Sequence, residues 1–194
     1  MRHPALLDRE RAVLVLIDLQ EGYRDVLFGW REVVSACATL VRGAGVLEVP
    51  LLVTEQYPRG LGRTASEVAQ WLPPELGVIE KLTLSCCGET EFLARLEATG
   101  RSQVIVAGIE AHACVVQTVH DLLAAGYQVH VARDAVSSRR RAHTFPAWEK
   151  MRVAGMLPTS SEQALLELVR TARAAEFKAV QTLLKEAPPP LEPG

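Results

Sequence analysis

Cys114 suggests chemistry because it follows a short apolar run and opens a helical pattern. Residues 104–107 are typical of a buried strand, Gly108 permits a sharp turn, and apolar residues recur at helical spacing over residues 113–125. Cys114 is therefore predicted in the first turn of a helix. The free N–H groups and positive dipole there favour a thiolate and can hold an oxyanion. The alternative is a small buried cysteine with a packing role.

Two charged residues end other apolar runs and could act together with this thiol. Asp18 ends the run at residues 12–18, and Lys81 ends the run at residues 78–81. Burying such a carboxylate is costly unless it has a partner, so Asp18 either caps a turn or faces a cation. A base, a cation and a nucleophile are the groups that nucleophilic catalysis requires. We interpret Asp18, Lys81 and Cys114 as such a set.

The elements that position these residues alternate between strands and helices. Strands are predicted at residues 12–18, 49–54, 78–81, 104–107, 128–132 and 156–159. Helices are predicted from residue 33 to a stop at Gly43 and Gly45, and at residues 64–72, 89–99, 113–125, 140–154, 159–169 and 174–185. Residues 64–67 and 159–162 have capping-box sequences, and residues 134–139 are predicted to form a polar turn.

This alternation predicts a three-layer α/β/α fold with a mostly parallel, doubly wound sheet. Active sites in such sheets lie outside the carboxyl ends of the strands, where the three reactive residues are expected to meet. The 194 residues suffice for one domain with a sizeable core. We expect a single domain over residues 1–186 and a Pro-rich, mobile tail over residues 187–194.

Composition narrows the range of partners and compartments. With 21 Lys and Arg against 23 Asp and Glu, the net charge is −2, which gives no electrostatic footprint for nucleic acid or an anionic membrane. No apolar run approaches the roughly 18 residues of a transmembrane helix, and the N-terminus lacks a signal-peptide pattern. We expect a cytosolic protein with a small-molecule substrate. The 48% apolar content and low net charge favour a homo-oligomer, a dimer or larger.

Three motifs resemble those of the isochorismatase-like cysteine hydrolases. They are residues 15–20 around Asp18, Lys81 with Ser85 four residues later, and residues 108–118 around Cys114. The resemblance runs from about residue 12 to residue 169. Residues 54–62 and 134–139 look like loops of the subgroup called isochorismatase domain-containing proteins.

The resemblance implies an isochorismatase-like fold and a catalytic triad of Asp18, Lys81 and Cys114. It also implies a cis peptide bond between Ile109 and Glu110. That bond would direct the Glu110 N–H beside the Cys114 N–H, so that the two amides form an oxyanion hole. Relatives in this superfamily are commonly dimers or larger, in agreement with the expected homo-oligomer.

The sequence departs from two branches of this superfamily. Nicotinamidases carry a metal-binding Asp-x-His cluster after the second strand, whereas residues 55–57 are Glu-Gln-Tyr with no histidine nearby. The five histidines also lack zinc-binding spacing, so we expect no metal and no cofactor. Isochorismatases that cleave a vinyl ether lack the cysteine, and Cys114 therefore indicates acyl chemistry on an amide-like carbonyl.

We predict a hydrolase in which Cys114 attacks a small amide and forms a thioester. Asp18 would accept the thiol proton, and Lys81 would stabilise the thiolate. One alternative is a redox sensor with Cys86 and Cys87 as resolving thiols. The other is a non-catalytic binding protein on the same fold. Asp18 favours hydrolysis, because a redox thiolate does not need a carboxylate as proton acceptor.

The substrate pocket is less well marked by the sequence. Gln20, Tyr23 and Tyr57 are candidates to line it. Arg59, Arg63 and residues 139–141 are loop residues that solvation explains more simply than a binding site, and Cys86 and Cys87 are more simply explained by loop packing.

Overall fold

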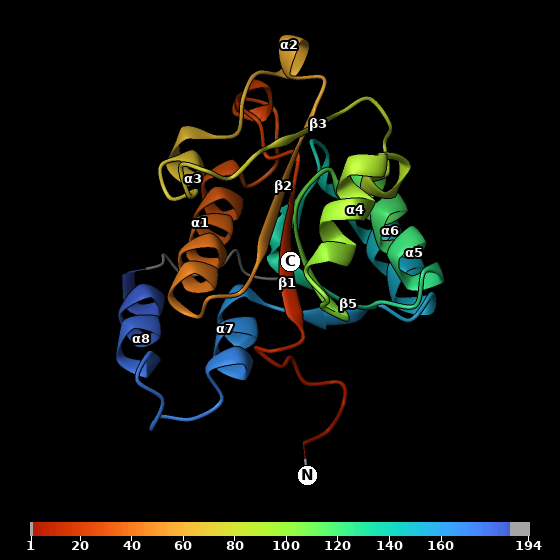
Figure 1. The fold of residues 1–194 in the computed structure, drawn as a ribbon. Coiled ribbons are helices and arrows are strands. Elements are labelled where there is room, and N and C mark those ends of the chain that lie inside the picture. The colour runs from red at the N-terminus through yellow and green to blue at the C-terminus, as the bar shows by residue number, and fades with distance from the viewer. Residues whose placement is uncertain (1, 187–194) are drawn as a thin grey trace.

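The computed structural model describes residues 2–186 and contains one six-stranded parallel sheet between two layers of helices (Figure 1). The tail predicted at residues 187–194 lies outside the described residues. The strand order is β3-β2-β1-β4-β5-β6, so β1 is central. The strands are β1 (Ala12–Ile17), β2 (Leu51–Gln56), β3 (Ile79–Lys81), β4 (Gln103–Ile109), β5 (Gln128–Ser137) and β6 (Leu157–Thr159). This architecture confirms the predicted doubly wound α/β fold.

The helices divide between the two faces of the sheet. One layer contains α1 (Trp30–Val46), α3 (Ser66–Ala69), α7 (Ser161–Val169) and α8 (Phe177–Glu186). The other contains α4 (Thr90–Ala98), α5 (Val116–Ala124) and α6 (Arg141–Val153). Short turns lie near the strand ends: 3-10 turns at Glu21–Tyr23 and Cys86–Gly88, a π-helical turn at Ala111–Val115, and α2 (Pro58–Leu61). None of the described helices has the length and apolar character needed to cross a bilayer.

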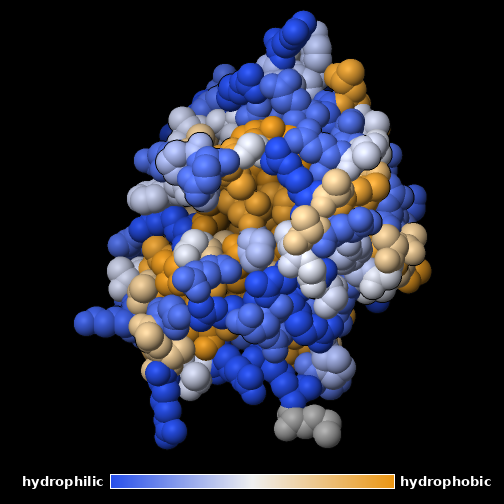
Figure 2. Space-filling model, in the orientation of Figure 1, coloured by the Kyte–Doolittle hydropathy of each residue, from blue (hydrophilic) through white to orange (hydrophobic). Residues whose placement is uncertain are grey.

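The central strand β1 belongs to both hydrophobic cores. Leu14 and Leu16 pack in the core on the α1 side, whereas Val15 and Ile17 pack in the core on the α5 side. A strand buried on both faces in this way has a continuous apolar sequence, which is why the run was recognisable. On the face in Figure 2, apolar residues are visible between the two helical layers.

The register of the sheet brings the predicted reactive residues to one edge. Ile17, the last residue of β1, pairs with Thr54 of β2 and with Gly108 of β4, and Gln56 pairs with Lys81. Asp18, Lys81 and the turn after β4 therefore lie at the carboxyl ends of neighbouring strands, where sites of such sheets are found.

The prediction of a polar turn at residues 134–139 is wrong for residues 134–137, which belong to β5. β5 continues to Ser137 and, after a register shift, pairs Val136 with Gly108. The polar residue Asp134 is accommodated because its carboxylate accepts hydrogen bonds from the amide and hydroxyl of Ser161. A strand can therefore continue through a sequence that resembles a turn when tertiary contacts satisfy its polar groups.

The two predicted capping boxes also differ from the structure. Thr64 does not cap a helix, because its hydroxyl donates to Glu55 Oε1 at 2.7 Å and α3 covers only Ser66–Ala69. In α7 the N-cap is Ser160, whose hydroxyl accepts from the Gln163 N–H at 3.1 Å. The second capping box therefore begins at Ser160, one residue later than predicted.

Helix α1 does not stop at Gly43 and Gly45 but continues to Val46. Gly43 faces the buried Leu165 of α7, and a Cβ built at Gly43 would lie 2.3 Å from Leu165 Cδ2. Gly43 is therefore a close-packing position between α1 and α7 rather than a helix stop.

The two glycines of α1 provide a matched pair of substitutions. Overpacking typically costs about 1–3 kcal/mol, more than the helix propensity gained, so Gly43→Ala should lower the free energy of unfolding. Gly45 has open space around its Cβ position, so Gly45→Ala should raise the free energy of unfolding by about 0.5–1 kcal/mol. Urea denaturation of both variants tests this expectation. Stabilisation by Gly43→Ala would contradict the close packing of α1 on α7.

Candidate active site

Asp18 and Lys81 form an ion pair buried at the strand ends. Lys81 Nζ lies 2.7 Å from Asp18 Oδ2, and the two side chains are 0% and 2% exposed. The Thr54 hydroxyl donates to Asp18 Oδ1 at 2.7 Å, and the Asp18 N–H donates to the Thr54 carbonyl. β2 thus supplies the polar contacts that hold the carboxylate between the ends of β1 and β3.

The three protons of the Lys81 ammonium all have other acceptors. Nζ donates to Gln56 Oε1 at 2.7 Å and to the carbonyls of Thr83 and Leu84 at 3.0 Å each. The ammonium thus has four oxygen neighbours, and its contact with Asp18 Oδ2 at 2.7 Å is the ion pair. Burial lowers the pKa of Lys81, but the charges of Asp18, Cys114 and Cys86 together outweigh it, and the pKa of Lys81 is raised.

Cys114 lies in the π-helical turn between β4 and α5, rather than in the first turn of an α-helix. Its Sγ is 4.0 Å from Gln56 Oε1, the same oxygen that accepts a hydrogen bond from Lys81. Burial and the charge of Asp18 raise the pKa of Cys114 to about 12, although Lys81 acts in the opposite direction. The expectation that this position favours a thiolate is therefore wrong: the resting side chain is a thiol.

The peptide bond between Ile109 and Glu110 is cis. The Glu110 carbonyl accepts hydrogen bonds from the amides of Ala113 and Val115, on either side of Cys114. The Glu110 N–H donates to no other described residue. The buried Glu110 carboxylate accepts from the Arg139 N–H at 2.8 Å and from Arg139 Nε at 3.0 Å. This contact fixes the turn against the segment before α6.

Gln56 is the functional residue that sequence reasoning missed. Its Oε1 contacts both Lys81 and Cys114, and its Nε2 donates to the Leu82 carbonyl at 3.0 Å. Gln20 is fully buried and bonds the Gln56 backbone twice, donating to its carbonyl at 3.0 Å and accepting from its N–H at 2.8 Å. Both Gln20 amide protons are used, the second by the Gly62 carbonyl, so Gln20 positions Gln56 rather than facing an open pocket.

The two tyrosines named as pocket candidates differ in their surroundings. Tyr23 is half-buried, and burial together with the charges of Glu110 and Cys114 raises its pKa to about 12. Tyr57 is 51% exposed, and no described contact links it to Cys114. Its ring instead lies over Gly60 in the α2 segment.

The other two cysteines near the site are not thiolates either. Cys86 is fully buried beside Thr54, and burial raises its pKa to about 11. Cys87 is half-buried, and burial raises its pKa to about 12. The four cysteines all carry free thiols, including the buried Cys37 of α1.

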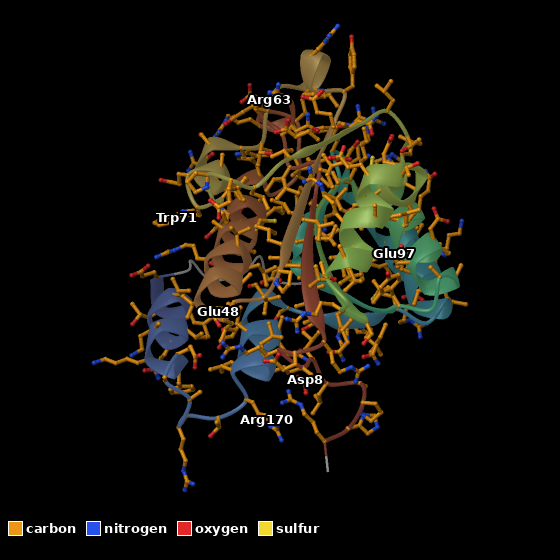
Figure 3. The ribbon with its side chains drawn as sticks, viewed as in Figure 1. Asp8, Glu48, Arg63, Trp71, Glu97 and Arg170 are labelled. Carbon is orange, nitrogen blue, oxygen red and sulfur yellow. The ribbon has the colours of Figure 1, made fainter. Side chains whose placement is uncertain are left out.

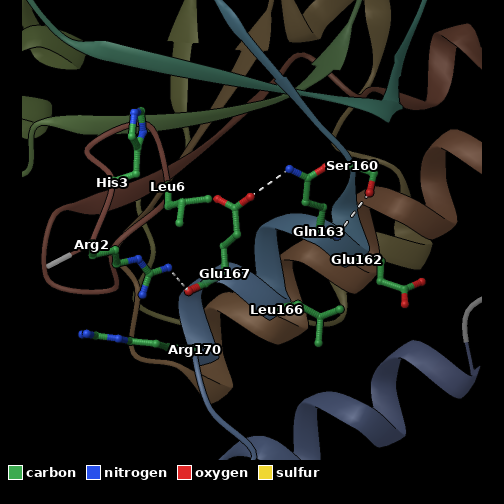
Figure 4. A pocket seen from close by; sticks show the side chains of 9 residues that line it. All are labelled: Arg2, His3, Leu6, Ser160, Glu162, Gln163, Leu166, Glu167 and Arg170. Atoms are coloured by element: carbon green, nitrogen blue, oxygen red, sulfur yellow. Dashed lines mark hydrogen bonds between the residues drawn. The ribbon is translucent and has the colours of Figure 1, made fainter.

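A cavity of about 410 Å³ opens beside the π-helical turn and is lined by Val26, His112, Arg139, Arg140 and His143. A second cavity of about 790 Å³ lies between the N-terminal segment and α7 (Figure 4). Within it, Gln163 donates to Glu167 at 2.8 Å and Arg2 donates to the Glu167 carbonyl at 2.6 Å. Figure 3 shows Arg170 of this second cavity at the opposite end of the molecule from Arg63, which pairs with Glu55 and Glu80 near the strand ends.

Comparison with known proteins gives consistent matches. The model of the isochorismatase domain matches residues 12–163. Isochorismatase domain-containing protein 2A from Mus musculus is 40% identical over 185 residues, or 93% of this chain and 85% of the relative. The structure of MAR1 ribonuclease from Caenorhabditis elegans has a TM-score of 0.91 at 35% identity and covers 97% of each chain. An octameric hydrolase of unknown specificity from Escherichia coli has a TM-score of 0.89 at 22% identity, covers 96% of this chain and 93% of its own, and shows a shared fold.

The surroundings of Cys114 predict the pH dependence of its alkylation. With a thiol pKa near 12, the thiolate fraction and the alkylation rate should rise about tenfold per pH unit from pH 7 to pH 10, without a plateau. Asp18→Asn removes a charge that raises this pKa and should speed alkylation at fixed pH, whereas Lys81→Met should slow it. Iodoacetamide labelling with peptide mapping at Cys114 measures both. A plateau below pH 9 would show that the resting residue is a thiolate.

Proposed function

The chain belongs to the isochorismatase family, and we propose that it is a hydrolase that uses Cys114 to cleave a small amide-like C–N bond through a thioester. The observation that carries the proposal is the state of Asp18. Its Oδ2 is buried 2.7 Å from the Lys81 ammonium, and burial together with the charge of Asp18 keeps the proton on Cys114. A proton acceptor next to a protonated nucleophile is the arrangement that general-base activation needs.

The first half of the proposed reaction transfers the acyl group to sulfur. Asp18 Oδ2 accepts the Cys114 proton while Sγ attacks the amide carbonyl carbon. The carbonyl oxygen becomes an oxyanion that the N–H groups of Glu110 and Cys114 bind, and loss of one such donor typically costs about 10²–10³ in rate. Asp18 then gives its proton to the departing nitrogen. The C–N bond breaks, the amine leaves, and a thioester remains on Cys114.

The second half returns the enzyme to its starting state. Asp18 accepts a proton from water as the water oxygen attacks the thioester carbonyl. The same two amides bind the second oxyanion. The C–S bond then breaks, the product leaves as a carboxylic acid, and Asp18 returns the proton to Sγ. The positive charge of Lys81 stabilises the Asp18 carboxylate and the transient thiolate. Gln56 contacts both Lys81 and Cys114 and so positions the one relative to the other.

The redox-sensor alternative has less support. A redox-sensing cysteine reacts as a thiolate, whereas burial raises the pKa values of Cys114, Cys86 and Cys87 to between about 11 and 12. A non-catalytic binding protein would have no use for a buried ion pair beside a thiol, since burying two charges is costly. Four free thiols fit the proposed reducing, cytosolic compartment.

The name of one similar structure, a ribonuclease, suggests RNA as a different substrate class. We propose a small amide because the net charge of −2 gives no general attraction for polyanions. We propose that the catalytic reaction requires no metal or other cofactor.

Asp18→Asn separates the hydrolase from its alternatives. The substitution keeps the shape of the side chain but removes the base, so ammonia release should fall by at least about 10². The assay is steady-state ammonia release from a panel of small amides and ureas. Asp25→Asn, an exposed change in the segment after β1, is the matched control and should keep full activity. Full activity of Asp18→Asn would remove Asp18 from the mechanism.

We also propose that the protein is a homo-oligomer. Two apolar residues on α6 are strongly exposed in the single chain, Phe145 at 70% and Val153 at 79%, and self-association would cover such side chains. Light scattering at micromolar concentration should give a mass of at least twice 21.2 kDa. A single species near 21.2 kDa would refute the proposal.

A further inference from the structure

The loop after β3, residues 82–88, supplies two of the acceptors of the Lys81 ammonium. The carbonyls of Thr83 and Leu84 each accept a hydrogen bond from Lys81 Nζ at 3.0 Å. The position of the ammonium therefore depends on where this loop lies. Helix α5 packs against the 3-10 turn of the loop at Cys86–Gly88. The contacts between the loop and α5 thus bear on the geometry of the site.

Thr118 of α5 joins this loop to the turn that carries Cys114. Its side chain is fully buried. The Thr118 hydroxyl donates to the Cys114 carbonyl at 2.7 Å and accepts from the Cys86 N–H at 2.9 Å. One oxygen atom therefore bonds the backbone of the proposed nucleophile and the backbone of the loop that holds Lys81. Cys86 is fully buried, so without this oxygen its N–H has no water to bond instead.

A second contact between α5 and the loop lies nearly one helical turn further along. Ser85 Oγ donates to Asp121 Oδ2 at 2.5 Å. Thr118 and Asp121 are three residues apart, so they lie on one face of α5. Asp121 is exposed, whereas Thr118 is buried. The loop is thus held to α5 by a buried contact at Thr118 and by an outer contact at Ser85.

We propose that Thr118 is a positioning residue, which fixes the Lys81 ammonium relative to Cys114 Sγ by holding the loop of residues 82–88 against α5. It acts through two backbone groups rather than on a reacting atom. Because Lys81 lowers the pKa of Cys114, an ammonium held less firmly would raise that pKa and slow the sulfur. The inference rests on the proposed function of Cys114, but the reactivity of the sulfur can be measured without a substrate.

Thr118→Val tests the role of the hydroxyl, because it keeps the branched shape of the side chain. The Cys86 N–H then lacks its acceptor, so the loop should move, and iodoacetamide should alkylate Cys114 at least about threefold more slowly at pH 8. Thr118→Ser retains the hydroxyl and should restore most of the wild-type rate. Peptide mapping reports the label at Cys114. A wild-type rate in Thr118→Val, or an equal loss in Thr118→Ser, would overturn the proposal.

Thr39→Val is the matched control. Thr39 is a buried threonine of α1, and its hydroxyl donates to the carbonyl four residues earlier, that of Ser35, at 2.9 Å. The bond from Thr118 to Cys114 has the same spacing. Thr39→Val therefore repeats the loss of a buried hydroxyl in the other helical layer, and it should leave the alkylation rate within about 1.5-fold of wild type. Equal slowing in the Thr39 and Thr118 variants would indicate a general loss of stability and overturn the proposal.

A double substitution tests the route through Lys81. In the Lys81→Met background the charge is already absent, so adding Thr118→Val should change the alkylation rate by less than about 1.5-fold. A further loss of about threefold or more in that background would show that Thr118 acts on Cys114 directly, and the proposed route would be overturned.

Ser85→Ala provides a second variant that removes the outer contact without changing the charge. It loosens the same loop and should slow alkylation of Cys114 by less than Thr118→Val does, so the proposal stays testable even where Thr118→Val does not fold. A wild-type rate in Ser85→Ala would show that the loop does not position Lys81 and would overturn the proposal.

Turnover distinguishes failure of this inference from failure of the proposed function. On an amide that the wild-type protein hydrolyses, Thr118→Val should lower kcat at least about tenfold and leave KM within about twofold, because Lys81 acts on the reacting groups rather than on substrate binding. A wild-type kcat in Thr118→Val would overturn the inference and leave the hydrolase intact. Slowed alkylation that depends on Lys81, with no amide hydrolysed by the wild-type protein, would overturn the hydrolase and leave the positioning role.

Discussion

The buried ion pair between Lys81 and Asp18 is the interaction on which the rest of the site depends. Two charges removed from water are costly unless their remaining lone pairs and protons are satisfied. Thr54, Gln56 and two loop carbonyls provide that satisfaction, and each must be placed by β2 or by the loop after β3. Asp18 Oδ1 accepts from the Thr54 hydroxyl, and Asp18 Oδ2 lies 2.7 Å from the Lys81 ammonium. The network that stabilises the pair therefore also fixes the orientation of the carboxylate.

A second property follows from the charge balance around sulfur. Lys81 is already matched by Asp18, so a thiolate at Cys114 would leave the buried cluster with an excess negative charge. The thiol is therefore favoured as the resting form, and in the proposed reaction the thiolate is generated only as it attacks. A cysteine that stays a thiol reacts slowly with oxidants and alkylating agents.

Much of the fold and of the candidate site could be predicted from sequence, for reasons visible in β1. Its continuous apolar run and terminal Asp18 indicated a buried strand that ends in a charge, and Lys81 gave the same signal at the end of β3. Gln56 gave no such signal, because its role depends on Gln20 and on the register of β2 with β3. The pKa of Cys114 was misjudged because local helix geometry says nothing of burial or of the distance to Asp18. Gly43 was misread because its close neighbour, Leu165, is distant in sequence.

The strand order has a consequence for how the chain acquires its site. β1 is the first strand in sequence but lies at the centre of the sheet, between β2 and β4. The site takes residues from the ends of β1, β2 and β3 and from the turn after β4, so no contiguous fragment ending before that turn contains it. Pairings between segments so distant in sequence close large loops and form late in folding. A nascent or partly unfolded chain thus lacks the complete candidate site, which forms only together with the assembled sheet.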